Sequence, residues 1–200
     1  MNQHYYTAQP QSAHDVKAHP VEVGGLALRF YTDSGVFSKA GLDQGTRLLI
    51  ESLPPLSGRV LDLGCGWGAL GIPLALLNPQ SQWVLTDINR RAADLARRNA
   101  QENGARNLQV LVGDGFEQVE GQFQAVVTNP PIRAGKGVIY PLFAQAMARL
   151  TPGGALYLVI RKQQGAASAM KYLSQLSGDT RCIAKDKGYW IIRCGKEDEP

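Results

Sequence analysis

One segment constrains the fold of this chain more than any other, because residues 60–68 read V-L-D-L-G-C-G-W-G. An apolar run followed by alternating glycines is typical of a buried strand that turns tightly into a helix, since glycine readily adopts the backbone conformations of such a turn. In open α/β sheets, ligands bind beside such loops at the carboxyl ends of the strands. The segment therefore predicts an α/β fold with a nucleotide-like ligand, although the glycines could also serve only to tighten the turn.

Two carboxylates help to identify that ligand. Residues 64–69 also satisfy the G-x-G-x-x-G/A pattern of dinucleotide-binding proteins, but Asp62, two residues before the first glycine, would repel a diphosphate. S-adenosylmethionine has no phosphate and carries a sulfonium and an ammonium, so it fits better. Asp87 follows Gly68 by 19 residues, where an acid can accept hydrogen bonds from ribose hydroxyls. We expect S-adenosylmethionine as the cofactor, with a nicotinamide-dependent dehydrogenase as the disfavoured alternative.

A second motif, Asn129-Pro130-Pro131-Ile132, follows the apolar run at 123–128. The exocyclic nitrogen of a base or an amide is a poor nucleophile because its lone pair is delocalised. The Asn129 side-chain oxygen and the Pro130 carbonyl could accept hydrogen bonds from such an amine and aim its lone pair at a methyl group. The prolines lack N–H donors and fix the corner. The four residues are therefore catalytic candidates, and the alternative is an ordinary turn that ends a strand.

Together these motifs resemble the class I S-adenosylmethionine-dependent methyltransferases. Asp87 matches their ribose-binding acid. Gly113-Asp114-Gly115-Phe116 follows an apolar run at the place where that family has an acid near the adenine amino group. Phe37 and Thr46 match positions near the methionine moiety, although helix capping by Asp43 and core packing by Phe37 are equally good explanations of that segment. The cofactor site that the resemblance implies comprises Phe37, Thr46, Asp62, Gly64, Cys65, Gly66, Gly68, Asp87, Ile88, Asp114, Gly115, Phe116 and Asn129.

A narrower resemblance covers residues 20–195. The sequences V-F-S-K-A-G-L-D-Q-G-T at 36–46, N-P-P-I-R-A-G-K at 129–136 and R-K-Q-Q-G-A at 161–166 are similar to the RsmC-type small-subunit ribosomal RNA guanine methyltransferases and their short single-domain relatives. This implies transfer to the 2-amino group of a guanine, with ribosomal RNA or a ribosomal subunit as the partner. The N-P-P motif alone also serves adenine and protein glutamine, and a noncatalytic RNA-binding ribosome assembly factor is the alternative of another class.

The residue after the prolines departs from a common pattern. Related enzymes with N-P-P-Y or N-P-P-F stack an aromatic ring on the acceptor base, whereas this chain has Ile132. We expect the stacking partner to come from elsewhere, with Phe30, Phe37 and Tyr189 as candidates.

Charge modestly favours a polyanionic partner. The formal net charge is +4, and residues 196–199 hold one base and three acids, which leaves 20 basic against 14 acidic residues, or +6, on the rest. Arg133, Lys136 and Lys162 lie in sequence beside the acceptor motif or at the end of a later apolar run, and we expect them to bind phosphates of the substrate. The arginines at 90, 91, 97 and 98 predict a solvated helix face.

Other features exclude several classes of protein. Three cysteines without C-x-x-C spacing, together with histidines confined to the first 20 residues, predict reduced thiols and no metal site. The absence of a signal peptide and of a long apolar span predicts a cytoplasmic protein that does not engage a membrane. We expect a loose arm at residues 1–20, one methyltransferase domain at 21–195 and an acidic tail at 196–200.

The remaining pattern alternates strands with helices. Apolar runs predict seven strands, at residues 60–63, 83–86, 108–112, 123–128, 155–160, 181–184 and 189–194. Capping and breaking residues predict helices at residues 43–53, 89–103, 139–150 and 166–176. A further helix follows the glycine loop and ends at residue 77. Residues 21–23 and 26–30 alternate around Gly24-Gly25 and predict a hairpin. The expected fold is a doubly wound, Rossmann-like α/β fold with a seven-stranded, mostly parallel sheet and an N-terminal hairpin extension.

Overall fold

A computed structural model of the chain describes residues 13–197. The elements, in chain order, are β1 (Lys17–Val23), β2 (Leu26–Thr32), α1 (Gln44–Ser52), β3 (Arg59–Leu63), α2 (Gly71–Leu77), β4 (Gln82–Asp87), α3 (Arg90–Glu102), β5 (Leu108–Val112), β6 (Phe123–Thr128), η1 (Ile132–Ala134), α4 (Lys136–Ala148), β7 (Leu150–Arg161), η2 (Lys162–Gln164), α5 (Ala166–Leu176), β8 (Thr180–Asp186) and β9 (Tyr189–Gly195).

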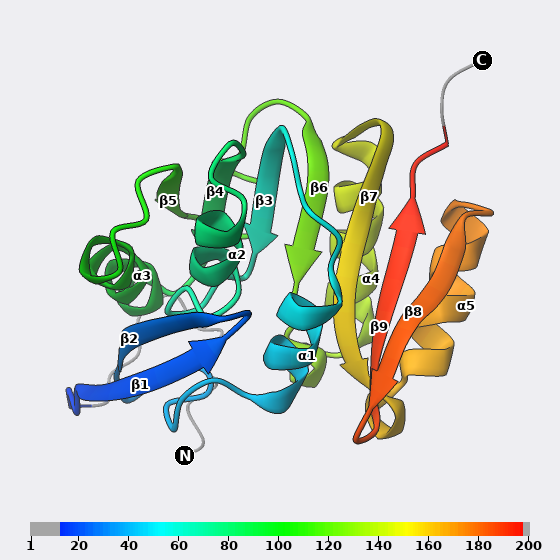
Figure 1. Cartoon of the computed structure of the whole chain (residues 1–200). Helices are drawn as coiled ribbons and strands as arrows, with labels where there is room; N and C mark the ends of the chain where they lie inside the picture. The colour runs from blue at the N-terminus through cyan, green and yellow to red at the C-terminus, as the bar shows by residue number, and fades with distance from the viewer. Residues whose placement is uncertain (1–12, 198–200) are drawn as a thin grey trace.

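Seven strands form one twisted sheet in the order β5-β4-β3-β6-β7-β9-β8, which confirms the predicted fold class (Figure 1). The pairs from β5 to β7 are parallel, and β9 is antiparallel to both of its neighbours. The strand order reverses between β3 and β6, because the chain runs outward from β3 to β5 and then returns to the other side. Ligands of open α/β sheets bind at such a switch point, beside the carboxyl ends of the strands.

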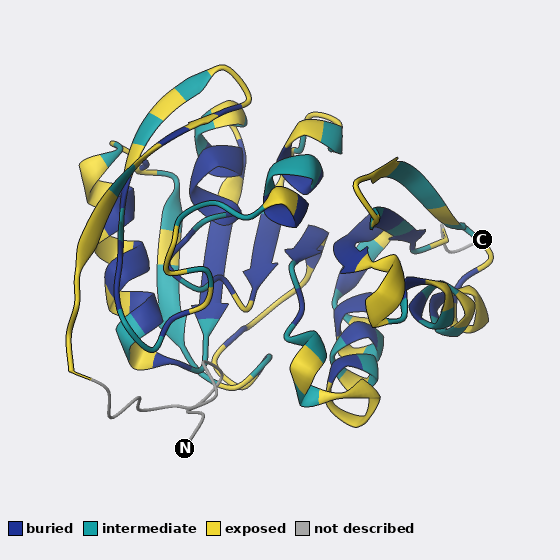
Figure 2. Ribbon diagram, turned by 90° about the horizontal axis from the view of Figure 1, so that it is seen from below, coloured by how far each residue is buried: buried dark blue, intermediate teal, exposed yellow. Residues whose placement is uncertain are grey.

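Helices cover both faces of the sheet, and the alternation of side chains along each strand decides which face each residue joins. Val60 packs with α1, α2 and α3, whereas its neighbour Leu61 packs with α4 and α5. Ala125 and Val126 on β6 divide between the two clusters in the same way. Figure 2, which looks onto the carboxyl ends of the parallel strands, shows the buried sheet between helices that turn exposed residues outward.

The β1–β2 hairpin lies outside the sheet, on the face that carries α3 (Figure 1). Asn99 of α3 joins the two, since its amide accepts from Tyr31 N at 2.7 Å and donates to Tyr31 O at 2.9 Å. The same Nδ2 donates to Trp67 O at 2.8 Å. The hairpin is thereby attached to the loop after β3.

The structure differs from the predicted boundaries in three places. β1 begins at Lys17, so residues 17–20 belong to a strand and not to the expected loose arm; residues 1–12 lie outside the described part. The helix predicted at 139–150 is α4, which begins at Lys136 and ends at Ala148. Residues 152–154, which fall between the predicted helix at 139–150 and the predicted strand at 155–160, lie within β7 at a register shift opposite β6. Gly154 permits this bulge because it lies close to the backbone of β6.

Candidate active site

One pocket lies at the switch point, at the carboxyl ends of the parallel strands. Its walls come from the loop after β3, from the ends of β4, β5 and β6, from the segment before α1, and from α4. The lining residues are Phe37, Thr46, Asp62, Leu63, Gly64, Cys65, Gly66, Trp67, Ala69, Leu70, Thr86, Asp87, Ile88, Ala92, Gly113, Asp114, Gly115, Thr128, Asn129, Pro130, Pro131, Leu142 and Phe143.

Asp62 is a buried carboxyl group that faces this pocket. It is 1% exposed, and its Oδ2 accepts from Gly71 N at 2.8 Å, at the start of α2. Its Oδ1 is buried and has no hydrogen-bond partner among residues 13–197. Burial, with a smaller contribution from Asp87, raises the pKa of Asp62 to about 8. A cationic ligand beside Asp62 would stabilise its carboxylate, because a nearby positive charge favours the ionised form of a carboxyl group.

Asp87 holds the glycine loop in place. Its Oδ2 accepts from Gly66 N at 2.7 Å and its Oδ1 accepts from Asn89 N at 2.8 Å. The pKa of Asp87 is raised, chiefly by burial, while the two backbone hydrogen bonds oppose the rise. Each carboxylate oxygen has a second lone pair, so the side chain can still accept from the hydroxyls of a ribose.

The three glycines of the loop serve different purposes. Gly64 and Gly66 have φ of 74° and 56°, and a Cβ on either would meet open space, so their backbone leaves room for a ligand. Gly68 has φ of 88°, but a Cβ there would lie 2.3 Å from Ile72 Cδ1. Gly68 is therefore needed for packing of the loop against α2, and the structure places it outside the pocket lining. Burial raises the pKa of Cys65 in the same loop, so its thiol is neutral.

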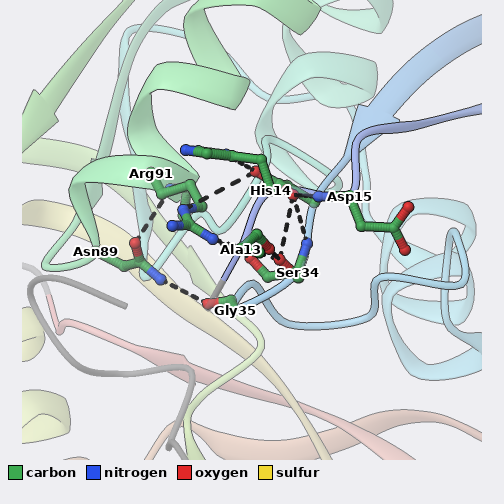
Figure 3. Close-up of polar contacts among 9 residues, drawn as sticks. Ala13, His14, Asp15, Ser34, Gly35, Asn89 and Arg91 are labelled. Atoms are coloured by element: carbon green, nitrogen blue, oxygen red, sulfur yellow. Dashed lines mark hydrogen bonds and ion pairs between the residues drawn. The ribbon is translucent and has the colours of Figure 1, made fainter. Parts of the chain in front are cut away.

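Hydrogen bonds attach the segment between β2 and α1 to the body of the protein (Figure 3). Asn89 Nδ2 donates to Gly35 O at 2.9 Å and Arg91 Nη1 donates to Ser34 O at 2.8 Å. Trp67 Nε1 donates to Phe37 O at 2.9 Å. These contacts place Phe37 at the pocket wall.

Asp33 anchors the beginning of this segment. It is 2% exposed, and it accepts hydrogen bonds from Asp15 N, from His14 Nδ1 and from Ser34 N. Burial raises the pKa of Asp33, but these hydrogen bonds outweigh burial and lower it. The stretch before β1 is thereby held against the segment that borders the pocket.

The acceptor corner lies directly after β6. Asn129 Nδ2 donates to Thr46 Oγ1 at 2.9 Å and to Asp43 Oδ2 at 3.4 Å. The Asn129 Oδ1 has no donor among the described residues. Pro131, with φ of −74° and ψ of 73°, has the conformation of the central residue of an inverse γ-turn, in which Ile132 N donates to Pro130 O at 2.8 Å. The Pro130 carbonyl retains one lone pair for a substrate amine.

Several predicted residues do not line the pocket. Phe116 is 7% exposed and packs in the cluster beneath α4 and α5, and Ile132 packs against the same cluster. Phe30, a candidate for base stacking, is fully buried against Trp67, so that candidate was wrong. Arg133, Lys136 and Lys162 are exposed and lie outside the lining. Tyr189 is half-buried, with the guanidinium of Arg161 4.7 Å from its ring centre.

Sequence reasoning missed the walls that carry no motif. Leu142 and Phe143 reach the pocket from α4, and Trp67 and Leu70 reach it from the loop after β3. These are apolar residues whose sequence pattern indicates core packing. Of these four residues, only Trp67 could have been predicted at the pocket, because it lies within the glycine loop.

The comparisons with known proteins agree with this architecture. A family model described as the methyltransferase small domain matches residues 27–193. The chain belongs to the methyltransferase small domain family. The fold is that of the class I methyltransferases, and the cofactor of these enzymes is S-adenosylmethionine. The donor set of the pocket fits it, because Asp62 has a buried oxygen with no partner in the described part of the chain, which can face a cation, and Asp87 ends β4 beside the glycine loop.

Individual relatives fall into short and long proteins. The chain is 38% identical over 200 residues to a Bacillus subtilis protein named "Uncharacterized protein YbxB", covering 98% of this chain and all of that protein. It is 35% identical over 190 residues to the ribosomal RNA small subunit methyltransferase C of Vibrio cholerae, covering 90% of this chain and 53% of that enzyme. The chain therefore spans about half the length of that longer relative.

A solved structure gives the same relationship. The Thermus thermophilus 16S rRNA N2 G1207 methyltransferase RsmC, determined in complex with AdoMet and guanosine, superposes with a TM-score of 0.83 at 26% identity. The match covers 94% of this chain and 52% of that one.

Among the described residues no helix is long and apolar enough to cross a membrane, and no group of three metal-ligating side chains is present.

Proposed function

We propose that this protein transfers a methyl group from S-adenosylmethionine to the 2-amino group of a guanine in small-subunit ribosomal RNA, in the cytoplasm. The observation that carries the proposal is the acceptor corner, in which an amide oxygen without a donor among residues 13–197 and a proline carbonyl lie beside a pocket suited to a cation. The names of the longer relatives support ribosomal RNA as the substrate class.

The residues divide the work between the two reactants. S-adenosylmethionine, when bound, supplies an electrophilic methyl group on a sulfonium. Asp62 offers an anionic oxygen to the positive end of the cofactor, and Asp87 offers lone pairs to its ribose. Asn129 Oδ1 and Pro130 O accept the two hydrogens of the substrate amine, which localises the nitrogen lone pair and points it at the methyl group. In-line alignment lowers the barrier as the nitrogen–methyl bond forms and the sulfur–methyl bond breaks. The methylated nitrogen is then cationic and acidic and releases one proton to water, so no strong base is needed.

Arg133, Lys136 and Lys162 are exposed cations around the carboxyl ends of β6 and β7. No described acid forms a salt bridge with any of the three. They are therefore available for phosphates on either side of the target nucleotide. Phosphate contacts of this kind fix the orientation of an RNA without reading its sequence, so they position the guanine and leave its recognition to the pocket.

The test is transfer of labelled methyl groups from S-adenosylmethionine to ribosomal RNA taken from cells that lack the gene. Mass-spectrometric mapping should find N2-methylguanine in small-subunit RNA. Asn129→Ala should lower kcat by about 10²- to 10³-fold, the range found when a preorganised polar partner of the transition state is removed, while cofactor affinity stays nearly unchanged. Gln145→Ala, which removes an exposed amide from α4, is the matched control and should keep the wild-type rate.

Two results would contradict the proposal. Methylation of a large-subunit guanine, of adenine or of a protein glutamine in place of the small-subunit guanine would reassign the substrate. An Asn129→Ala variant as active as the Gln145→Ala control would remove the assigned role of the acceptor corner.

A further inference from the structure

A chain of hydrogen bonds connects the acceptor corner to the first turn of α1. Asn129 Nδ2 donates to Thr46 Oγ1 at 2.9 Å, and Thr46 Oγ1 donates to Asp43 Oδ2 at 2.6 Å. Asn129 Nδ2 also lies 3.4 Å from Asp43 Oδ2. Thr46 is 2% exposed, so water does not compete for its hydroxyl. The three side chains come from segments 83 residues apart in sequence.

The chemistry of the three groups fixes the direction of every bond. An ionised carboxylate has no hydrogen, so the Thr46 hydroxyl must donate its one hydrogen to Asp43. The Thr46 oxygen can then only accept from Asn129, and only the amide nitrogen of Asn129 can donate. The Asn129 Oδ1 therefore faces away from Thr46. Since Asn129 lines the pocket and Oδ1 has no donor among residues 13–197, the oxygen is the atom left for the substrate.

Asp43 is itself rigidly held. Its Oδ1 accepts from Gly45 N at 3.0 Å and Thr46 N at 3.1 Å, which makes it the N-cap of α1. Gly45 is packed so closely that an added Cβ would lie 2.7 Å from a ring carbon of Tyr189. The first turn of α1 is therefore fixed between its cap and β9. Such a turn can hold an amide in one orientation, because neither the carboxylate nor the hydroxyl can move away.

We propose that Asp43 and Thr46 are positioning residues, which lock the Asn129 side chain with its oxygen directed at the acceptor amine. The inference rests on the proposed function, since it assigns a task in the same transfer. Without the lock the amide of Asn129 could rotate and present its NH₂ group, which would repel the hydrogens of the amine. Outer partners that orient a functional side chain typically contribute 10- to 100-fold, as seen around metal ligands.

Two substitutions test the lock from different sides. Thr46→Val removes the hydroxyl at nearly constant volume and leaves both backbone bonds of the N-cap, so kcat should fall by about 10- to 100-fold. Because Thr46 also lines the pocket, kcat is measured at saturating cofactor, where a change in cofactor affinity does not contribute. Thr46→Ser retains the hydroxyl and should restore most of the rate. Asp43→Asn keeps a good N-cap, but its amide nitrogen would donate to Thr46 and reverse the chain. This variant should also have a lower kcat. It therefore provides an independent test if Thr46→Val folds poorly.

The control is Thr151→Val, which removes a threonine hydroxyl at the start of β7. This end of the strand lies away from the pocket, which is at the carboxyl ends of the parallel strands. It should leave both kcat and the cofactor dissociation constant as in the wild type. In the background of Asn129→Ala, Thr46→Val should have no further effect on kcat, because the group that it orients is gone. A full additional loss in that background would show that Thr46 acts independently of Asn129, and it would overturn the proposal.

The outcomes separate the two proposals. If the wild type methylates guanine and Asn129→Ala abolishes this, while Thr46→Val and Asp43→Asn both keep the wild-type kcat, the positioning role is wrong and the proposed function stands. Thr46→Ser as slow as Thr46→Val would also contradict the role of the hydroxyl. If the wild type transfers no methyl group to guanine, the proposed function itself fails.

Discussion

Cofactor binding should depend on pH through Asp62. In the free protein the pKa of this carboxyl group is raised to about 8, first by burial and then by the charge of Asp87. At neutral pH most molecules therefore carry a protonated Asp62. Beside a sulfonium and an ammonium the ionised form is favoured, so the pKa of Asp62 falls in the complex. Binding then releases a proton, and the affinity for S-adenosylmethionine rises with pH.

The size of the effect follows from linkage. If Asp62 is fully ionised in the complex, the observed dissociation constant is proportional to 1 + 10^(pKa − pH). The pKa in this expression is that of Asp62 in the free protein, about 8. Raising the pH from 6 to 7 then strengthens binding by about ninefold, or about 1.3 kcal/mol, and about 0.9 proton is released per cofactor at pH 7. Measurements should stay below about pH 7.5, because an α-amino group titrates near 7.7 to 8.0.

Isothermal titration calorimetry in two buffers of different ionisation enthalpy measures both quantities. Asp62→Asn keeps the shape of the side chain and cannot ionise, so its affinity should vary by less than about twofold over the same range. Cys65 does not titrate here, because burial raises its pKa well above its ordinary value. The reasoning would be refuted by a wild-type affinity that is flat between pH 6 and 7 without proton release, or by an Asp62→Asn variant with the same slope.

Two further predictions concern the rest of the scaffold. Asp87→Ala should weaken cofactor binding, because it removes both the proposed acceptor for the ribose hydroxyls and the hydrogen bond from Gly66 N; an unchanged calorimetric affinity would contradict this. Gly154→Ala would place a Cβ 2.9 Å from both Gln124 O and Thr151 O, and overpacking of this kind costs about 1–3 kcal/mol. Thermal unfolding should show a Tm lower by about 2–12 °C, and a Tm equal to that of the wild type would show that the bulge adapts without strain.

The fold was largely predictable because its signals are local. Residues 60–63 form an apolar run before glycines. A run of this kind between helical segments is typical of a strand that is buried on both faces of a parallel sheet. Asp62, Asp87 and Asn129 each fall at or next to the carboxyl end of such a strand, and parallel strands bring those ends together. The sequence alone therefore indicates one shared pocket.

The features that the sequence did not reveal depend on contacts between distant segments. The bond between Asn129 and Thr46 spans 83 residues, and no spacing rule links the two. Leu142 and Phe143 look like ordinary helix residues until α4 is placed against the sheet. Gly154 falls just outside the strand predicted at 155–160, because glycine is unfavourable in the interior of a strand. Its role in a bulge depends on the position of the β6 backbone.

In the proposed reaction, the acceptor corner also determines which substrate atoms can react. Pro130 and Pro131 have no N–H groups, and both hydrogens of the Asn129 amide are engaged with Thr46 and Asp43. The corner therefore offers acceptors and no donors from these side chains and prolines. A carbonyl oxygen such as guanine O6 would meet only other oxygens there, whereas an amino group satisfies both acceptors. The same hydrogen bonds that fix the orientation of Asn129 thus make the corner selective for an amine, and selectivity and alignment follow from one arrangement.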